Sequence, residues 1–421
     1  MKEFIKKLSP VFFLDTYHFI LAFLGALIYR FPSKNIKIIG VTGTNGKSTT
    51  VHLITKILET AGFRVATLSS ISFKINKKEW PNTLRMTMPG RLQIQKFLRQ
   101  AVDSKCQYAV LEVTSEGIKQ YRHKFINFEV AVFTNLTPEH IEAHGSFENY
   151  KRAKGKLFRA TKNIHVINIE DENKEYFLKF PAKEKYGFGI KNQESRIKNK
   201  FNKTLEAKEI KLRENSASFI IHNSLFNIHL MGSFNLYNAL AAICVGLSQD
   251  VSLKICQRAL ERVTGIPGRM ELVISKPFKV FVDYAFTPNA LEKVYRVIRE
   301  NFNPKKMICV FGSCGGGRDK WKRPVLGKIA AQYCDEIIIT NEDPYDENPM
   351  EIVEQVAQGT QGKAKKILDR REAIREALKL AKQGDTVVIT GKGCEPSICV
   401  AGGKRIPWDD RKVTREEFKK L

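Results

Sequence analysis

A stretch of eleven residues from Gly40 to Thr50 constrains the fold of this chain more than any other part of it. It reads G-V-T-G-T-N-G-K-S-T-T, it follows an apolar segment with Ile36, Ile38 and Ile39, and a helical pattern of apolar residues comes after it. A strand, a glycine-rich loop and a helix in this order form a phosphate cradle, because backbone N–H groups and the positive end of the helix dipole point at one anion. A plain turn between a strand and a helix would not need glycines, a lysine and hydroxyls at these offsets.

Within this loop, Lys47 is placed to reach the β- and γ-phosphates of a nucleotide, and Ser48 to offer a hydroxyl to Mg²⁺. The loop departs from the general spacing G-x-x-x-x-G-K-[ST], because Val41 stands five positions before Gly46. It has the narrower form T-G-T-N-G-K-S. The loop residues that we expect to bind the nucleotide are Gly43, Thr44, Asn45, Gly46, Lys47, Ser48 and Thr49.

The net charge limits the partners of the chain. With 421 residues it is long enough for two or three domains, and 70 Lys and Arg against 44 Asp and Glu give a net charge of +26,. Such a charge attracts nucleotides, anionic lipid surfaces and nucleic acids. The basic residues are spread out, however, and the densest stretch, 179–213, has few aromatic residues and no nucleic-acid-binding motif,. We expect a small-molecule substrate and no nucleic acid.

An uninterrupted apolar run extends from Phe19 to Tyr29. Eleven residues are too few to span a bilayer, which takes about 20, and no cleavage site for a signal peptide follows the run. We expect residues 1–35 to form a short apolar helical segment. It either packs on the nucleotide-binding core or contacts a membrane surface through residues 11–31, in a protein of the cytoplasm or the inner face of the membrane. The eight cysteines form no C-x-x-C pair, which favours free thiols over a zinc site,.

Apolar strands alternate with helices in two successive units, which predicts an α/β fold: a P-loop-type central ATPase domain with a mostly parallel sheet, and a C-terminal Rossmann-like α/β domain. The run G-I-P-G at 265–268 separates them, so the expected domains are 1–35, 36–267 and 268–421. Residues 181–231 suggest a β-rich insertion. Strands are predicted at 36–41, 108–113, 130–134, 164–169, 279–283, 307–311, 336–340 and 385–390. Helices are predicted at 50–61, 89–103, 147–160, 236–247, 288–301, 323–333, 349–358 and 371–382.

Two further residues are candidates for metal binding. Glu112 ends an apolar strand, which is the usual place for a carboxylate that holds Mg²⁺ directly or through water. His140 follows the strand at 130–134, at the edge where strand ends meet ligands. A lone histidine is more often structural, and on physical grounds alone both interpretations of His140 stay open.

Longer strings follow the cradle in a fixed order. They are E-V-T-S at 112–115, F-T-N-L-T-P-E-H-I-E-A-H-G at 133–145, Y-K-R-A-K at 150–154, G-S-F-N-L-Y-N-A at 232–239, G-I-P-G-R-M-E at 265–271, V-D-Y-A-F-T-P-N-A-L-E at 282–292 and G-K-G-C-E at 391–395. This series resembles the Mur ligases across residues 36–411. With G-R-M-E and the string G-G-x-R-D-K-x-K-R-P that ends at Pro324, it is most similar to the branch that adds diaminopimelate or lysine to UDP-N-acetylmuramoyl-L-Ala-D-Glu.

The resemblance implies a reaction and a set of roles. ATP phosphorylates a substrate carboxylate, and an amine displaces the phosphate to form an amide in peptidoglycan precursor synthesis. By resemblance, Ser48 and Glu112 serve one Mg²⁺, His140 serves a second, and Lys154 corresponds to a lysine that the family carbamylates into a metal ligand. The resemblance further assigns adenine-side, phosphate and ribose contacts to Asn235, Asn238, Arg269 and Asp283, and the acceptor site to Arg318, Asp343, Tyr345 and Glu395.

The sequence also departs from the family pattern. Only 35 residues precede the nucleotide strand, whereas the family has a UDP-binding domain of roughly a hundred residues there, so the donor is either UDP-linked and held otherwise or lipid-linked. The usual acceptor string D-N-P-R reads Glu342-Asp343-Pro344-Tyr345, and tyrosine cannot form the bidentate clamp that arginine makes on a carboxylate. Phe286 stands for a usual histidine, and Thr114-Ser115-Glu116 for S-S-H. A diamino acid bound through an ammonium group is the preferred acceptor.

Two alternatives remain. The chain could be a related amide ligase of the folylpolyglutamate, cyanophycin or lipid-linked-precursor type, although the last often carries four zinc-binding cysteines and the first usually lacks G-R-M-E. It could also be an ATPase stimulated by nucleic acid, which would not need both a carboxylate donor and an amine.

Overall fold

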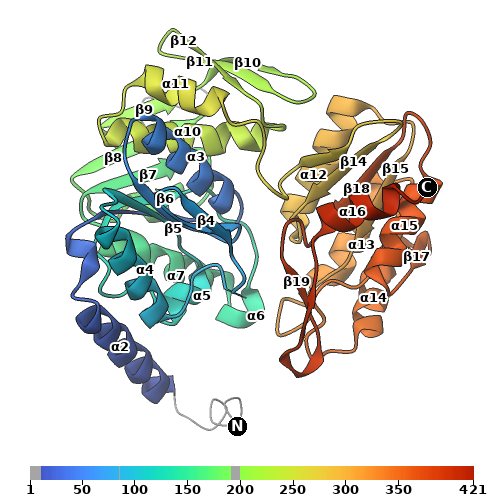
Figure 1. The fold of residues 1–421 in the computed structure, drawn as a ribbon, viewed down its shortest axis with the longest axis horizontal. Helices are drawn as coiled ribbons and strands as arrows, with labels where there is room; N and C mark the ends of the chain where they lie inside the picture. The colour runs from blue at the N-terminus through green and yellow to red at the C-terminus, as the bar shows by residue number, and fades with distance from the viewer. Residues whose placement is uncertain (1–10, 85, 191–199) are drawn as a thin grey trace.

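The computed structural model describes residues 11–84, 86–190 and 200–421 (Figure 1). In these residues a large sheet has the strand order β4-β3-β2-β5-β1-β6-β7-β8-β9, and all neighbours from β2 to β9 are parallel. The mostly parallel sheet that the sequence predicts is therefore present. Its strands are β1 Lys37–Thr42, β2 Val65–Leu68, β3 Ser72–Ile75, β4 Lys78–Pro81, β5 Tyr108–Glu112, β6 Phe128–Phe133, β7 Ile164–Asn168, β8 Glu184–Gly189 and β9 Lys203–Glu206.

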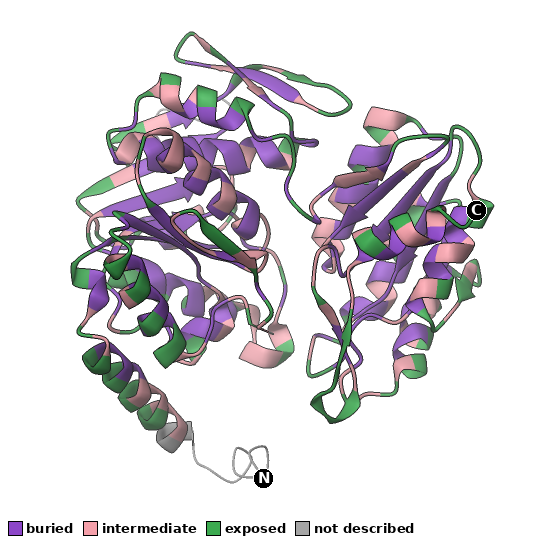
Figure 2. Ribbon diagram, in the orientation of Figure 1, coloured by how far each residue is buried: buried purple, intermediate pink, exposed green. Residues whose placement is uncertain are grey.

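Helices cover both faces of this sheet, because strands in a parallel sheet are apolar on both sides. Along β1, Ile39 and Val41 face one core cluster while Ile38 faces the other, as the two-residue period of a strand requires. The helices of this first unit, after the N-terminal helix, are α3 Lys47–Thr60, α4 Arg91–Asp103, α5 Ser115–Lys119, α6 Ile141–His144, α7 Phe147–Ala160, α8 Lys174–Leu178, α10 Ser233–Ser248 and α11 Leu253–Glu261. Figure 2 shows the central strands of the sheet buried between these layers, whereas the edge strand β4 is largely exposed.

The region 181–231 is rich in strands, as expected, but it divides between two sheets. Strands β8 and β9 extend the large parallel sheet, and only the three strands after them form a separate antiparallel sheet. Residues 191–199 lie outside the described residues. The separate strands are β10 Lys208–Leu212, β11 Ala217–Ile221 and β12 Ser224–Ile228.

A second sheet begins after residue 270 and has the order β13-β14-β18-β15-β16-β17. It is parallel except for β13, which pairs antiparallel with β14 at one edge. Its strands are β13 Glu271–Ile274, β14 Lys279–Asp283, β15 Met307–Phe311, β16 Glu336–Ile339, β17 Ala364–Lys366 and β18 Thr386–Thr390, with a ribbon of β19 Ser397–Cys399 and β20 Arg405–Pro407. Its helices are α12 Pro288–Phe302, α13 Lys322–Tyr333, α14 Pro349–Ala357, α15 Arg370–Leu380 and α16 Asp410–Phe418.

The N-terminal apolar run lies in a helix, α2 Val11–Ile28, which packs on α4. Small residues allow this close approach, since Ala22 and Ala26 are buried and Gly25 lies against the backbone of Arg91. The opposite side of α2 is exposed (Figure 2). Within the described parts of the chain, no helix is both long and apolar enough to cross a membrane. Residues 1–10 of the expected N-terminal segment lie outside the described residues.

Candidate active site

The phosphate cradle joins the end of β1 to the start of α3, as the sequence predicts. Its backbone needs glycine at two points, because Gly43 has φ +151° and Gly46 has φ +82°. A Cβ atom at Gly43 would lie 1.9 Å from Thr134 Oγ1, and one at Gly46 would lie 2.3 Å from Asn238 Oδ1. Both positions therefore exclude any other residue. Helix α3 begins at Lys47, so its N-terminus points its free N–H groups at the cradle,.

The cradle is braced by the loop after β6. The Asn45 N–H donates to Asn135 Oδ1 at 2.9 Å, the Asn135 amide donates back to the Asn45 carbonyl at 3.0 Å, and the Thr44 N–H donates to the Asn135 carbonyl at 2.8 Å. Thr134 Oγ1 donates to the same Asn45 carbonyl at 2.7 Å. Sequence reasoning placed Asn135 in a family string without giving it a role. The sequence feature that could have indicated a role for Asn135 is its position directly after a predicted buried strand that neighbours β1.

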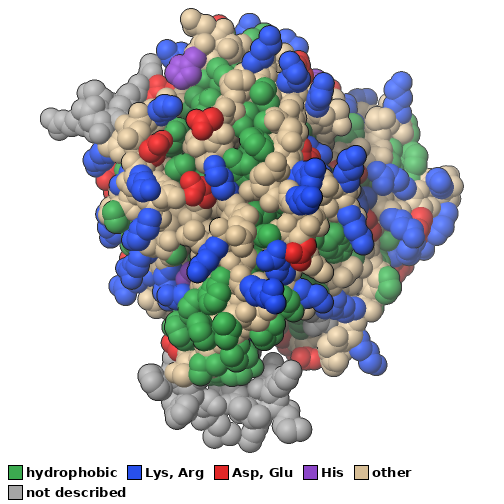
Figure 3. All heavy atoms as spheres, turned by 60° about the vertical axis from the view of Figure 1, so that its left-hand side comes forward, with side chains coloured by type: hydrophobic (Ala, Val, Ile, Leu, Met, Phe, Trp, Pro, Cys, Tyr) green, Lys and Arg blue, Asp and Glu red, His purple; other side chains and the backbone are tan. Residues whose placement is uncertain are grey.

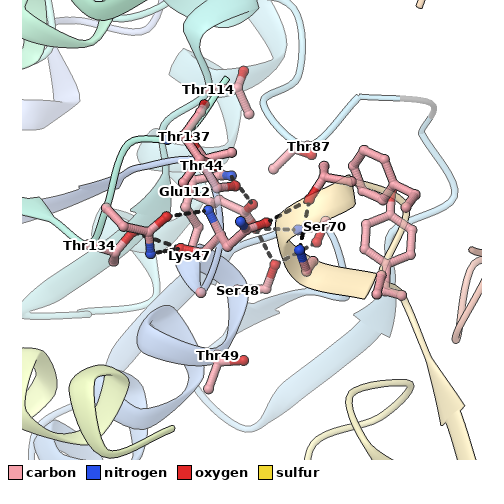
Figure 4. A pocket seen from close by; sticks show the side chains of 18 of the residues that line it. Thr44, Lys47, Ser48, Thr49, Ser70, Thr87, Glu112, Thr114, Thr134 and Thr137 are labelled. Carbon is pink, nitrogen blue, oxygen red and sulfur yellow. Dashed lines mark hydrogen bonds and ion pairs between the residues drawn. The ribbon is translucent and has the colours of Figure 1, made fainter. Parts of the chain in front are cut away.

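The polar groups expected at one Mg²⁺ lie together. Ser48 Oγ donates to Glu112 Oε2 at 2.9 Å, and the Lys47 ammonium lies 4.0 Å from Glu112 Oε1 (Figure 4). Ser70, which the sequence did not single out, joins them: its N–H donates to Glu112 Oε2 at 2.9 Å and its hydroxyl lies 2.8 Å from Ser48 Oγ. Burial lowers the pKa of Lys47, an effect that Glu112 partly offsets. Bound phosphates would restore the charge balance around this lysine.

His140 and Lys154 lie close by but face other partners. Lys154 is 1% exposed, and its ammonium donates to the Gly43 carbonyl at 2.7 Å and lies 4.5 Å from the centre of the Tyr150 ring. Burial, with Lys47 adding to it, lowers the pKa of Lys154 well below its usual value. His140 Nδ1 lies 3.4 Å from Arg318, and burial together with Arg318 lowers the pKa of His140 to about 2. The His140 ring is therefore neutral and can offer a lone pair.

A cavity of about 720 Å³ opens in front of the cradle. Its walls come from the carboxyl ends of the large sheet and from the first loops of the second unit, the usual position of a ligand site in α/β proteins. Of the residues that the sequence assigned to nucleotide and metal, the cavity is lined by Thr44, Asn45, Gly46, Lys47, Ser48, Thr49, Glu112, His140, Asn235, Asn238, Arg269 and Asp283. Gly43 and Lys154 lie behind the loop and do not line it.

The expected adenine, phosphate and ribose residues come from both units. Asn238 donates to Asn235 Oδ1 at 3.0 Å at the start of α10, and Asn235 donates to the Met231 carbonyl at 2.8 Å. Asp283 ends β14 and accepts the N–H of Met270 and of Ala285, each at 2.7 Å. These bonds fix the Asp283 carboxylate at the cavity wall.

Arg269 connects the second unit to the metal-binding groups. It lies 4.3 Å over the Tyr284 ring and donates to Ser70 Oγ at 3.3 Å. Ser70 in turn contacts both Ser48 and Glu112. One hydrogen-bonded chain therefore runs from the cradle to a guanidinium of the other unit.

The residues expected at the acceptor site line a smaller cavity of about 80 Å³, which Arg318 shares with the larger one. In it, Lys392 donates to Asp343 at 2.8 Å and also pairs with Glu395, whose other oxygen accepts the Tyr284 hydroxyl at 2.7 Å. Burial opposes the charge on Lys392, but Glu395 and Asp343 outweigh it and raise the pKa. Two carboxylates thus pair with one lysine ammonium, and a third, that of Glu342, lines the same cavity.

Comparison with known proteins gives the family. The family model described as "Mur ligase middle domain" matches residues 41–246, and the one described as "Mur ligase, glutamate ligase domain" matches residues 268–393. A protein of Syntrophomonas wolfei named UDP-N-acetylmuramoyl-L-alanyl-D-glutamate--2,6-diaminopimelate ligase is 40% identical over 409 residues, which cover 94% of this chain and 81% of that protein. The chain belongs to the Mur ligase family.

Solved structures agree with this. One titled as a UDP-N-acetylmuramoyl-L-alanyl-D-glutamate--2,6-diaminopimelate ligase has a TM-score of 0.59 and 29% identity, covering 91% of this chain and 78% of that one. Folylpolyglutamate synthase of Mycobacterium tuberculosis has a TM-score of 0.72 with 88% and 92% coverage, and at 15% identity it shows the shared fold alone. As a Mur ligase, the protein is an ATP-dependent ligase that forms amide bonds, and the family uses ATP and Mg²⁺.

The donor groups fit the Mg²⁺ that a Mur ligase uses. A serine hydroxyl and a carboxylate are hard oxygen ligands, and Ser48 and Glu112 present both at the mouth of the cradle,. In the part of the chain that the structure describes, no group of three or more His, Cys, Asp or Glu side chains could hold a metal ion by itself. This suits Mg²⁺, which is commonly held by one or two protein groups with phosphates and water completing its shell.

Proposed function

We propose that this Mur ligase adds an amino acid, a diamino acid, to a UDP-N-acetylmuramoyl-dipeptide-like precursor of peptidoglycan. The observation that carries this proposal is the identity of 40% across 94% of the chain to a ligase named for that donor. Two adjoining cavities that share Arg318 support it, because one opens at the cradle and the other at the carboxylates of the acceptor site. The division into residues 1–35, 36–267 and 268–421, the site roles below and a cytoplasmic location belong to the same proposal.

The reaction proceeds in two balanced steps. The donor carboxylate attacks the γ-phosphorus of ATP, so that an acyl-phosphate forms and ADP leaves. The acceptor nitrogen then attacks the carbonyl carbon, the bond between that carbon and the phosphate oxygen breaks, and phosphate departs as the nitrogen loses a proton. The loop N–H groups and Lys47 bear the phosphate charge throughout. His140 lines the same cavity with a lowered pKa, so its ring would be available as a metal ligand there.

Mg²⁺, when bound, neutralises phosphate charge and orients the γ-phosphate for in-line attack. Ser48 and Glu112 would hold one ion, and His140 would serve a second. We further propose that Lys154 is carbamylated. Only a neutral amine attacks CO₂, and the burial that lowers the pKa of Lys154 favours the neutral form of its amine,. The product carries a carboxylate-like group in place of an ammonium.

The acceptor site favours a substrate bound through an ammonium group. Glu342 is 2% exposed, and its Oε2 has no hydrogen-bond partner among the described residues. Burial raises the pKa of this carboxyl, a cost that a bound ammonium would offset. Tyr345 supplies no guanidinium for a distal carboxylate, which leaves Arg318 to anchor the α-carboxylate.

The direct test is phosphate release from ATP with the purified protein, Mg²⁺ and UDP-N-acetylmuramoyl-L-Ala-D-Glu. Each assay contains one acceptor, which is diaminopimelate, lysine, ornithine, glutamate or ammonia. Mass spectrometry then determines the mass of the product. We expect release with a diamino acid only and a product of matching mass. Release with glutamate on a folate donor, or with ammonia on a lipid-linked donor, would replace this proposal by one of the related ligases.

Tyr345→Arg tests the acceptor assignment. The arginine should form a bidentate clamp on a distal carboxylate and so shift the ratio of kcat/KM for diaminopimelate over lysine upward by about 10-fold or more. Met350→Arg, on the neighbouring helix α14 where Met350 is 39% exposed, adds the same charge outside the site and should leave the ratio unchanged. An unchanged ratio in Tyr345→Arg would remove Tyr345 from the acceptor site.

We also propose that the exposed side of α2 contacts an anionic membrane surface. Seven of the seventeen large hydrophobic side chains that are exposed in the described residues lie on this one helix. Figure 3 shows them as a continuous apolar area with Lys and Arg side chains beside it. They are Tyr17, Phe19, Ile20, Phe23, Leu24, Leu27 and Ile28.

Charge decides between a membrane and a second copy of the chain as the occupant. Lys34 lies 5.3 Å over Phe31, whose ring contacts Phe23. Lys124 is exposed, and in the sequence it stands between Tyr121 and Phe125, whose rings both contact Phe19. A net charge of +26 repels a second copy and attracts anionic lipid,. A lipid-linked donor would be met at such a surface.

Flotation with vesicles of phosphatidylcholine containing about 30% phosphatidylglycerol measures this contact. The protein should float with these vesicles and stay behind with phosphatidylcholine alone, and Leu24→Glu with Leu27→Glu should abolish flotation. Leu212→Glu with Leu225→Glu is the matched control, since these leucines are 47% and 51% exposed on the small antiparallel sheet. Failure to float combined with dimerisation that the α2 variant abolishes would assign the surface to a second copy.

A further inference from the structure

The loop that carries His140 is held by the other unit of the molecule. Residues 139–142 lie between β6 and α7 in the first unit, whereas residues 318–322 precede and begin α13 in the second. Five contacts join these two short segments, which are about 178 residues apart in the sequence. The R-D-K-x-K string supplied this second segment, and only its Arg318 has a role in the reaction as described so far.

Asp319 makes the most directed of these contacts. Its Oδ1 accepts the Glu142 N–H at 2.9 Å and its Oδ2 accepts the Ile141 N–H at 3.2 Å. Asp319 is 1% exposed, so both carboxylate oxygens are committed to the backbone of the opposite unit. These two amides are the first of the short helix α6, directly after His140. A carboxylate at such N–H groups is a helix cap supplied from a distant part of the chain.

An ion pair and a further backbone contact flank Asp319. Lys322 donates to Glu139 Oε1 at 2.8 Å, and the two side chains are 1% and 2% exposed. In the second of these contacts the side chain belongs to the first unit: Glu142 Oε1 accepts the Lys320 N–H at 2.6 Å. Residues on both sides of His140 are thereby fixed.

The backbone conformation of His140 indicates what these contacts between the two segments hold in place. His140 has φ +57°, a left-handed conformation that residues with a Cβ atom adopt uncommonly, histidine more often than most,. Within the first unit, the His140 carbonyl accepts the His144 N–H at 3.0 Å and the His140 ring lies 5.9 Å from the Tyr150 ring. From the second unit come the contacts to Glu139 before it, to Ile141 and Glu142 after it, and from Arg318 to the His140 ring itself. The second unit therefore contributes to the direction of the His140 ring from both sides of the residue.

We infer that Asp319 and Lys322 form an interdomain clasp that positions His140, so that the site is complete only when the second unit is closed over the cavity. The inference rests on the proposed function in so far as His140 serves the reaction. Asp319 is a positioning residue, since it acts through the 139–142 loop. With this clasp, phosphoryl transfer would require that the acceptor-binding unit is closed. The reactive acyl-phosphate would then not form in a site that is open to water.

Amide hydrogen exchange in the intact protein, without substrate, measures directly whether the clasp protects residues 139–145. In Asp319→Ala, the amides of Ile141 and Glu142 lose their acceptors, and we expect the peptide that covers 139–145 to exchange at least about 10-fold faster. Asp335→Asn is the control, because Asp335 accepts the Met307 N–H at 2.7 Å within the second unit and should leave 139–145 unchanged. The pair variant Glu139→Gln with Lys322→Met removes the buried ion pair without leaving an unpaired charge, so it remains informative if Asp319→Ala does not fold.

Kinetics then separate positioning from simple damage. We expect kcat to fall about 10- to 100-fold in Asp319→Ala, whereas the affinity for ATP in the absence of donor should stay within about 3-fold, since the whole cradle and Asn235 and Asn238 belong to the first unit and only Arg269 and Asp283 come from the second,. Unchanged exchange at 139–145 would overturn the clasp, and faster exchange with an unchanged kcat would overturn its coupling to catalysis. A wild type without ligase turnover would instead count against the proposed function, while the exchange result would still decide whether the clasp exists.

Discussion

Replacing Lys47 with alanine should lower kcat for ligation by at least about 10²- to 10³-fold, which corresponds to roughly 3–4 kcal/mol of transition-state stabilisation. The lysine is the cation of the cradle, with its ammonium 2.9 Å from the Thr44 carbonyl and 4.0 Å from Glu112. Its removal leaves the loop N–H groups alone against the charge of the transferred phosphoryl group. Phosphate release coupled to product mass measures the effect.

The fold of this variant should survive, because Lys47 is a desolvated cation whose pKa burial lowers, and its loss relieves that burial. Circular dichroism and the thermal midpoint check this. Lys56→Ala, on the same helix, is the matched control, because the Lys56 side chain is 40% exposed and pairs only at 3.7 Å with Glu59 on the surface. Ligation at the wild-type rate in Lys47→Ala would show that the loop does not bind the reacting phosphates.

Lys154→Ala should reduce ligation about 10²-fold or more, and added bicarbonate should not restore it. In the wild type, stripping CO₂ from the buffer should lower activity, and bicarbonate should bring it back. The physical reason is that burial lowers the pKa of Lys154 and so favours the neutral amine that reacts with CO₂, while the carbamate that forms is an anion that a divalent cation would stabilise,. A carbamate resonance from ¹³C-bicarbonate that is present in the wild type and missing in the variant would identify the group.

Lys156→Ala controls for the loss of a lysine from the same helix, since Lys156 is exposed and two residues further along α7. Its activity should follow CO₂ as the wild type does. Wild-type activity that ignores CO₂ would remove the carbamate from the mechanism, and Lys154 would keep only the structural contact with the Gly43 carbonyl that the structure records.

The cradle and the strands around it could be predicted from the sequence, because local patterns determine them. The order of an apolar segment, a glycine-rich loop and an apolar-periodic helix placed β1 and α3, although α3 begins at Lys47, three residues earlier than expected. Glu112 could be placed at the metal-binding groups because a buried strand ended there. The antiparallel edge strand β13 and the small sheet of β10–β12 were less predictable, since their short polar-alternating pattern is satisfied by several sheet positions,.

The contacts that span both units could not be predicted, because nothing local marks them. Ser70 lies in an ordinary loop, yet it contacts Ser48, Glu112 and Arg269. Asp319 belongs to a string that the sequence used only to recognise the family, and its partners are backbone N–H groups, which carry no sequence signal at all. The direction of Lys154 toward Gly43 depends in the same way on how α7 packs beneath the cradle.

The bracing of the cradle has a consequence for the thermodynamics of nucleotide binding. Asn135 and Thr134 hold Asn45, and Asn238 lies against Gly46, without any help from a bound ligand. The loss of conformational entropy that accompanies ordering of this loop therefore occurs during folding and not when ATP binds. Calorimetry of ATP binding should accordingly show no heat-capacity signature of a loop that folds around its ligand, and any such signature should come from closure of the second unit.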